Sequence, residues 1–117
     1  IKGRSNMMSI LEKIFGDFSE KKAWREMENR AKALPGDYYN AYKAMQKYLW
    51  NTGGLMDWQE TKFIFIHIID LLEEAAADGK RVKEVTGNDV AAFCDDLVID
   101  AKSWMDKQRQ KLNDAIK

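Results

Sequence analysis

The feature that most constrains the fold is residues 63–69, an apolar stretch interrupted by a single polar residue. Asp57 and Glu60 precede it with the spacing of a helix capping box, and strong helix formers continue it without a break. We therefore predict a helix over residues 57–78 rather than a buried β-strand, which the aromatic and β-branched residues would also permit. Because its first half is apolar on nearly every side, this helix lies at the centre of the fold or faces a partner.

Apolar residues recur at helical spacing on both sides of this segment. Gly16, Pro35 and the glycines after Thr52 separate the helices, and Asp37 and Asp89 are expected to cap two of them. The other predicted helices cover residues 6–15, 17–34, 37–50 and 89 to the C-terminus, with a short connecting segment before residue 89. These helices predict an all-α fold: an antiparallel bundle of about five helices, four of them long, without a sheet.

The size and composition of the chain indicate one globular domain over residues 1–117, of which residues 1–6 are expected to be an extension or poorly ordered. The chain has 117 residues, of which 45% are hydrophobic and 32% charged, which suffices for one core. The single cysteine, Cys94, excludes an internal disulfide and a cysteine-based zinc site, so a reducing, cytoplasmic environment is expected. Its position on an apolar stripe predicts a raised thiol pKa. We expect no membrane-spanning segment, because charged residues interrupt each apolar run.

Charge is balanced overall but unevenly distributed along the sequence. There are 19 basic and 19 acidic residues; the net charge is +4 over residues 1–50, −7 over residues 57–100 and +3 over residues 101–117. Either oppositely charged helices attract one another within the bundle, or unlike patches drive self-association. The absence of net positive charge argues against nucleic-acid binding, for which only a basic stripe of Lys21, Arg25 and Lys32 and a basic C-terminal tail are available.

No catalytic constellation is present, so we expect neither an enzyme nor a cofactor. His67, Asp70 and Glu74 share one helical face and are the only candidates for a metal site, but a di-iron bundle would need Glu three residues before His67, where Ile64 stands. A cluster of tyrosines between residues 38 and 48, with Trp50, could form part of the core or line a ligand groove.

Five segments in order also resemble a known family. They are KAWREM at residues 22–27, KALPGDY at 32–38, QKYLW at 46–50, EEAAADGK at 73–80 and VTGNDVAAFC at 85–94. The sequence is similar over nearly its whole length to bacterial domain-of-unknown-function family 1048. The resemblance implies a cytoplasmic protein of Gram-positive type bacteria. The family is sometimes labelled a ferritin-like DNA-binding protein and is associated with PadR-type transcriptional regulators, but it has no established catalytic residues to transfer.

Together these patterns predict a non-enzymatic protein-interaction module that self-associates, as a homodimer. The interface candidates are Trp58, Phe63, Ile66 and Ile69. One alternative is an accessory of transcription regulation that contacts DNA through the basic stripe, and a PadR-type regulator is the protein partner that the resemblance suggests. The other alternative is a binder of a small ligand or metal through the tyrosine cluster or His67.

Overall fold

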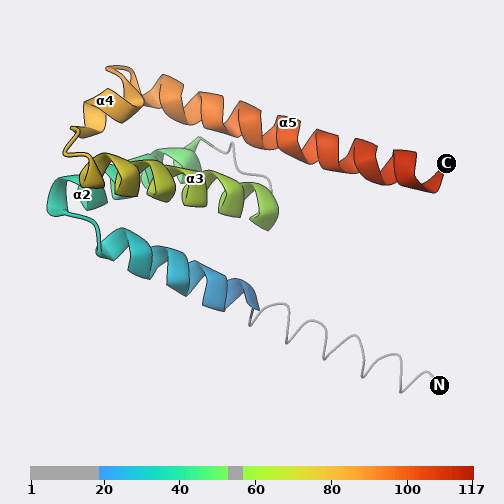
Figure 1. Ribbon diagram of the computed structural model, residues 1–117, viewed down its shortest axis with the longest axis horizontal. Helices are drawn as coiled ribbons and strands as arrows, with labels where there is room; N and C mark the ends of the chain where they lie inside the picture. Colours follow the sequence, from blue (N-terminus) through green and yellow to red (C-terminus); the bar gives the residue numbers. More distant parts are fainter. Residues whose placement is uncertain (1–18, 53–56) are drawn as a thin grey trace.

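The computed structural model describes residues 19–52 and 57–117, and within these ranges it contains helices and no strand. The helices are residues 19–32, α2 (Gly36–Asn51), α3 (Trp58–Ala77), α4 (Val82–Thr86) and α5 (Val90–Ile116). Figure 1 shows the four long helices running alternately in opposite directions, with α4 at one end. The predicted all-α antiparallel bundle is confirmed. The predicted helix over residues 6–15 and residues 1–6 lie outside the described residues.

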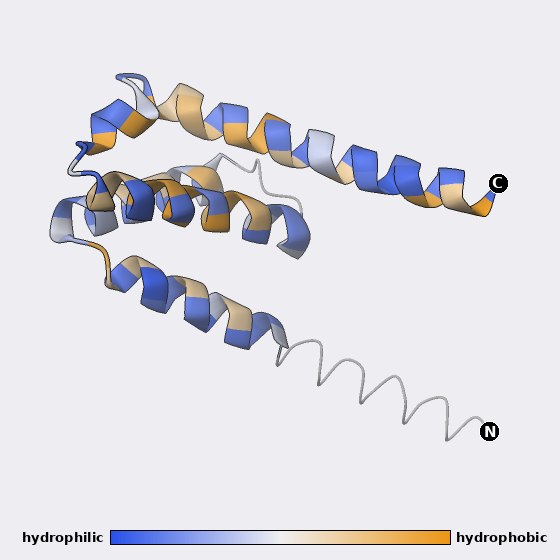
Figure 2. Cartoon of the chain, viewed as in Figure 1, coloured by the Kyte–Doolittle hydropathy of each residue, from blue (hydrophilic) through white to orange (hydrophobic). Residues whose placement is uncertain are grey.

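Helix α3 is the central helix of the bundle. Five of its side chains, Ile64, Phe65, Ile68, Ile69 and Leu72, have at most 1% of their surface exposed. They pack against buried residues of the other long helices, including Met27, Tyr42 and Leu97. Each such aliphatic side chain contributes about 1.5–3 kcal/mol of hydrophobic stabilisation on burial. Figure 2 shows the concentration of hydrophobic residues on this helix.

Two helices begin at the predicted caps, and one does not. Asp57 Oδ1 accepts a hydrogen bond from the Glu60 amide at 2.8 Å, and Asp89 Oδ1 accepts one from the Ala92 amide at 3.0 Å. The prediction that Asp37 caps the next helix was wrong. Helix α2 already begins at Gly36, and Pro35 is its N-cap residue. The carbonyl oxygen of Pro35 accepts hydrogen bonds from the amides of Tyr38 and Tyr39, in the first turn of the helix.

The segment between α3 and α5 was expected to be a connection but contains the short helix α4. Gly79 ends the preceding helix with a φ of +69°, a conformation that glycine adopts without strain. Glu84 then accepts a hydrogen bond from the Arg81 amide at 2.6 Å, which satisfies a donor at the start of α4. Gly87, with a φ of +75°, ends α4 and turns the chain towards α5.

Polar side chains connect helices that are far apart in sequence. Arg30 of the first described helix lies 2.6 Å from Asp70 Oδ1 and 2.6 Å from Glu73 Oε1 of α3. The Tyr38 hydroxyl donates to the backbone carbonyl of Lys80, and the Tyr48 hydroxyl donates to Asp95 Oδ1 at 2.8 Å. These contacts fix the relative positions of the helices around the apolar core.

Candidate interaction surfaces

The end of α5 extends past the other described helices (Figure 1). Ala101 is the last buried residue of α5, and residues 102–117 are exposed apart from half-buried Met105. The apolar line that is buried at Cys94 and Ala101 nevertheless continues along this projecting end, where Leu112 and Ile116 are 60% and 75% exposed. We call residues 102–116 the projecting end of α5.

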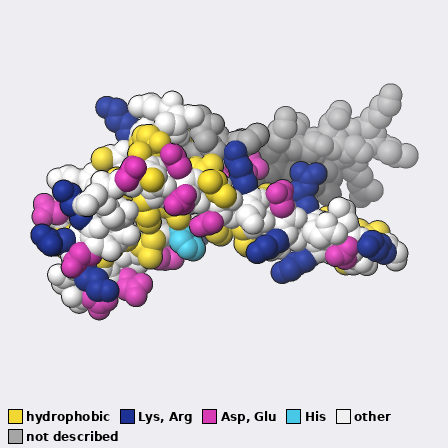
Figure 3. Space-filling view, turned by 90° about the horizontal axis from the view of Figure 1, so that it is seen from above, with side chains coloured by type: hydrophobic (Ala, Val, Ile, Leu, Met, Phe, Trp, Pro, Cys, Tyr) yellow, Lys and Arg dark blue, Asp and Glu magenta, His cyan; other side chains and the backbone are white. Residues whose placement is uncertain are grey.

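The projecting end is also basic. Residues 101–117 carry five basic and two acidic side chains. Figure 3 shows Lys and Arg side chains along this end and also at the opposite end of the molecule, with acidic side chains frequent between them. The projecting end therefore combines exposed apolar side chains with a positive charge.

A second surface feature is a shallow hollow of about 280 Å³ between α3 and α5, which we call the aromatic hollow. Phe63 stacks on His67 with ring centroids 5.2 Å apart and on Trp104 with centroids 5.4 Å apart. Ile66, Gln59 and Lys62 complete its lining. The interface candidates Phe63 and Ile66 thus lie together, and Trp104, which the sequence prediction did not include, lies with them.

The other two interface candidates are placed elsewhere. Ile69 is 0% exposed and packs in the core, so its assignment to an interface was wrong. It lies on the side of α3 that faces the other helices. Trp58 is half-buried and lines a different hollow, together with the basic stripe.

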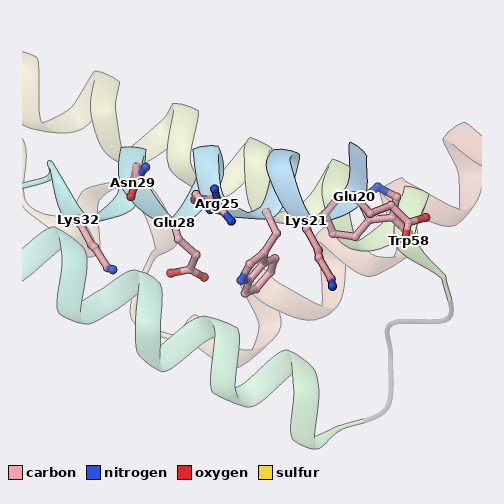
Figure 4. A pocket seen from close by; sticks show the side chains of 8 residues that line it. Glu20, Lys21, Arg25, Glu28, Asn29, Lys32 and Trp58 are labelled. Atoms are coloured by element: carbon pink, nitrogen blue, oxygen red, sulfur yellow. The ribbon is translucent and has the colours of Figure 1, made fainter. Parts of the chain in front are cut away.

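That hollow, about 570 Å³ in volume, lies at the first described helix (Figure 4). It contains all three residues of the predicted basic stripe, Lys21, Arg25 and Lys32. Glu20 and Glu28 line the same hollow and offset much of the positive charge. A phosphate backbone would therefore meet carboxylates as well as cations at this site.

The metal candidates do not assemble into a site. Within residues 19–52 and 57–117, no group of three or more His, Cys, Asp or Glu residues is arranged to hold a metal ion. His67 is exposed and stacked on Phe63, while the Asp70 carboxylate is bound to Arg30. Arg30 donates hydrogen bonds to Glu73 and Asp70, and these bonds raise the pKa of its guanidinium group.

The tyrosine cluster does not form one ligand groove. Tyr42 is buried in the core, and burial raises its pKa. Tyr38 reaches the end of α3, and Tyr48 reaches α5, where its hydrogen bond to Asp95 raises the pKa of the phenol. Trp50 packs edge-on against Phe65 with ring centroids 5.4 Å apart. These side chains connect helices to each other.

An apolar groove that the sequence prediction missed lies between α2, α4 and α5. Its volume is about 360 Å³, and it is lined by Ala41, Ala44, Met45, Tyr48, Val82, Val90, Ala91 and Cys94. Three of the lining residues are alanines, and the groove exists because their side chains are too small to fill the space between the helices. Burial raises the pKa of the Cys94 thiol to about 11. The thiol is therefore protonated at neutral pH, so it is a poor nucleophile and forms part of the apolar lining of the groove.

The fold and these surfaces define a small all-α protein with apolar grooves and a projecting helix. No helix among the described residues has the length and apolar character needed to span a membrane. The family model for "Protein of unknown function (DUF1048)" matches residues 13–117, so the chain belongs to the DUF1048 family.

Among solved structures, the chain is similar to a DUF1048 protein from Bacillus cereus ATCC 10987, described as having a left-handed superhelix fold. The two share 42% sequence identity with a TM-score of 0.61, over 66% of this chain and 94% of the other. The comparison with curated proteins gives no match.

Proposed function

We propose that this DUF1048 protein is a non-enzymatic interaction module that self-associates as a homodimer through the projecting end of α5. The observation that carries the proposal is the exposure of Leu112 and Ile116 on a helix segment without a buried residue. An isolated helix of this length is marginal in water, and most helices in proteins are stabilised by packing of their apolar side. A second copy supplies that packing.

Symmetry makes a copy of the same chain a suitable partner. Closed two-fold dimers are the commonest soluble oligomers, and they pair the same surface of each subunit. The chain carries no net charge, but its basic C-terminal segment and its acidic middle segment can attract their counterparts in a second molecule. The single buried thiol suits a reducing, cytoplasmic setting.

Sedimentation equilibrium over a micromolar concentration range tests the proposal. The native chain is expected to be a dimer. The dissociation constant of the dimer is expected to be at least about tenfold higher for the double variant Leu112→Glu/Ile116→Glu. Ile99→Glu is the matched control, because Ile99 is 64% exposed on the opposite side of α5. A native chain that remains monomeric at high micromolar concentration would contradict the proposal.

The two alternatives from the sequence have less support. Contact with DNA through Lys21, Arg25 and Lys32 is weakened by Glu20 and Glu28 in the same hollow. Metal binding at His67 is weakened because Arg30 already engages Asp70. A PadR-type regulator as a further partner stays a prediction from the family resemblance.

A further inference from the structure

We propose, building on self-association, that the apolar groove between α2, α4 and α5 receives the projecting end of α5 from the second copy. In this arrangement the two α5 helices run antiparallel about a two-fold axis near Ser103, and each subunit fills the groove of the other. Four observations support this: the character of the groove, the register along α5, the side of the helix and the distribution of charge.

The groove suits aliphatic side chains. Alanines at positions 41, 44 and 91 leave space beside Met45 and Val82, and the lining is almost entirely apolar. Leu112 and Ile116 are the most exposed aliphatic residues of the projecting end, so the proposed contact removes apolar surface from water on both sides.

One register of the two α5 helices brings both exposed side chains, Leu112 and Ile116, to groove residues of the partner. When two copies of this helix are antiparallel and centred on Ser103, Leu112 of one lies level with Cys94 of the other. The same register places Ile116 level with Val90. Both Cys94 and Val90 line the groove, so one placement brings two exposed side chains to it.

These residues also lie on one side of the helix. At 100° per residue, Ala91, Cys94, Met105, Leu112 and Ile116 fall within about one sixth of the helix circumference. In an antiparallel two-fold pair the same side of each helix faces the partner. The side of α5 that opens onto the groove is therefore the side that presents the apolar residues of the projecting end.

The charges favour the antiparallel arrangement. Asp89, the N-cap residue of α5, and Asp95 lie next to the groove residues Val90 and Cys94. The proposed register brings Lys117 and Lys111 of the partner level with these two carboxylates. Asp96 and Asp100 add negative charge to the same half of the helix. Parallel pairing would instead place the two basic ends side by side, at a cost in electrostatic free energy.

Disulfide cross-linking tests the register. Ala91→Cys/Ile116→Cys is introduced with Cys94→Ala, so that the two new thiols are the only ones in the chain. Within one α5 these positions are about 37 Å apart, far beyond the Cα separation of about 4.4–6.8 Å that a disulfide permits. We expect mild oxidation to give a covalent dimer on a non-reducing gel. Ile99→Cys/Ile116→Cys in the same background is the control and is expected to stay uncross-linked, because Ile99 faces away from the groove.

The outcomes separate this inference from the proposed function. A chain that sediments as a dimer without forming the Ala91–Ile116 cross-link contradicts the groove while leaving self-association intact. A ladder of covalent oligomers contradicts the closed two-fold arrangement, and a monomer contradicts both proposals.

A substitution in the groove provides an independent readout. Ala44 is exposed, so Ala44→Glu is expected to leave the monomer folded while adding a charge where the partner's aliphatic side chains would lie. Dimerisation should weaken about tenfold or more by sedimentation. Ala33→Glu, an exposed position outside the groove, should leave it unchanged. Equal dimerisation by the two variants would overturn the inference.

Discussion

The indole of Trp104 stacks on the phenyl ring of Phe63, with ring centroids 5.4 Å apart and planes inclined by 27°. Trp104 is 38% exposed and follows the last buried residue of α5 by three positions. This contact is therefore where α5 stops packing on α3 and begins to project. The part of α5 before Trp104 packs on the core, and the part after it has no buried residue.

A double-mutant cycle should show that this stacking is a real coupling. Phe63→Ala and Trp104→Ala are each expected to lower the free energy of unfolding, with a coupling of about 0.5–1.5 kcal/mol between them. Urea denaturation followed by circular dichroism measures all four chains. Trp104→Ala combined with Arg30→Gln serves as the additive control pair, since these residues belong to separate contacts. Full additivity of the Phe63 and Trp104 variants would contradict the prediction.

The ion pair between Arg30 and α3 should contribute modestly to stability. The carboxylates of Asp70 and Glu73 are more than a third exposed, so solvent screening limits the gain, although two carboxylates bind one guanidinium. Arg30→Gln is expected to lower the free energy of unfolding by about 1 kcal/mol in low salt and by less in high salt. Arg30→Lys should recover only part of the loss, because an ammonium cannot make the bidentate contact with Glu73. Urea titrations at two salt concentrations measure both effects, and a loss independent of salt would argue against an ionic origin.

Two isoleucines three positions apart should respond differently to the same substitution. Ile69 is fully buried, so Ile69→Asp is expected to prevent folding, because an unpaired carboxylate in the core costs several kcal/mol. Ile66 is half-buried at the aromatic hollow, so Ile66→Asp is expected to give a folded chain of lower stability. Circular dichroism and thermal unfolding distinguish the two. An unfolded Ile66→Asp chain would show that this position belongs to the core.

Stability should decline at alkaline pH because of the thiol of Cys94. Burial raises its pKa from 9.0 to about 11. Below pH 9 the thiol is protonated in both states and has no effect. Between pH 9 and 11 the unfolded chain releases the proton while the folded chain retains it, so the free energy of unfolding falls as pH rises.

The measurement is the free energy of unfolding from pH 8 to 11 for the native chain and for Cys94→Ala. The variant is expected to be less stable at pH 8, because it leaves a small cavity, but to lose less stability on going to pH 11. The buried phenol of Tyr42 contributes a decline that both chains share. Parallel pH profiles would contradict the prediction, because they would show that the thiol of Cys94 has the same pKa in the folded and the unfolded chain.

Much of the fold could be predicted because its determinants are local. The apolar run in α3 and the caps at Asp57 and Asp89 are visible within a few residues of sequence, and the structure confirms them. Helix α4 was missed because five residues are too few to show a helical period. The start of α2 was misplaced because Asp37 has the side chain of a cap, whereas the carbonyl of Pro35 makes the hydrogen bonds.

The surfaces were harder to predict because they depend on tertiary contacts. Ile66 and Ile69 look equivalent in the apolar run, and only the packing of neighbouring helices distinguishes them. The partners of Arg30 lie 40 and 43 residues away, so no local pattern identifies them. The groove was missed because alanines contribute little to a hydrophobic pattern in the sequence. Their small size, which forms the groove, matters only once the helices are packed together.

The projecting end of α5 has a consequence for the lifetime of the protein in the cell. Lys107, Arg109 and Lys111 are exposed on a helical segment that has no buried residue of its own. Such a segment opens locally at little cost in free energy, and an open, basic segment is a substrate for trypsin-like proteases. In the proposed dimer this segment is shielded, whereas a monomer would be cleaved there and would lose Leu112 and Ile116. Turnover would then remove orphan chains and set the cellular amount of the protein by assembly as well as by synthesis.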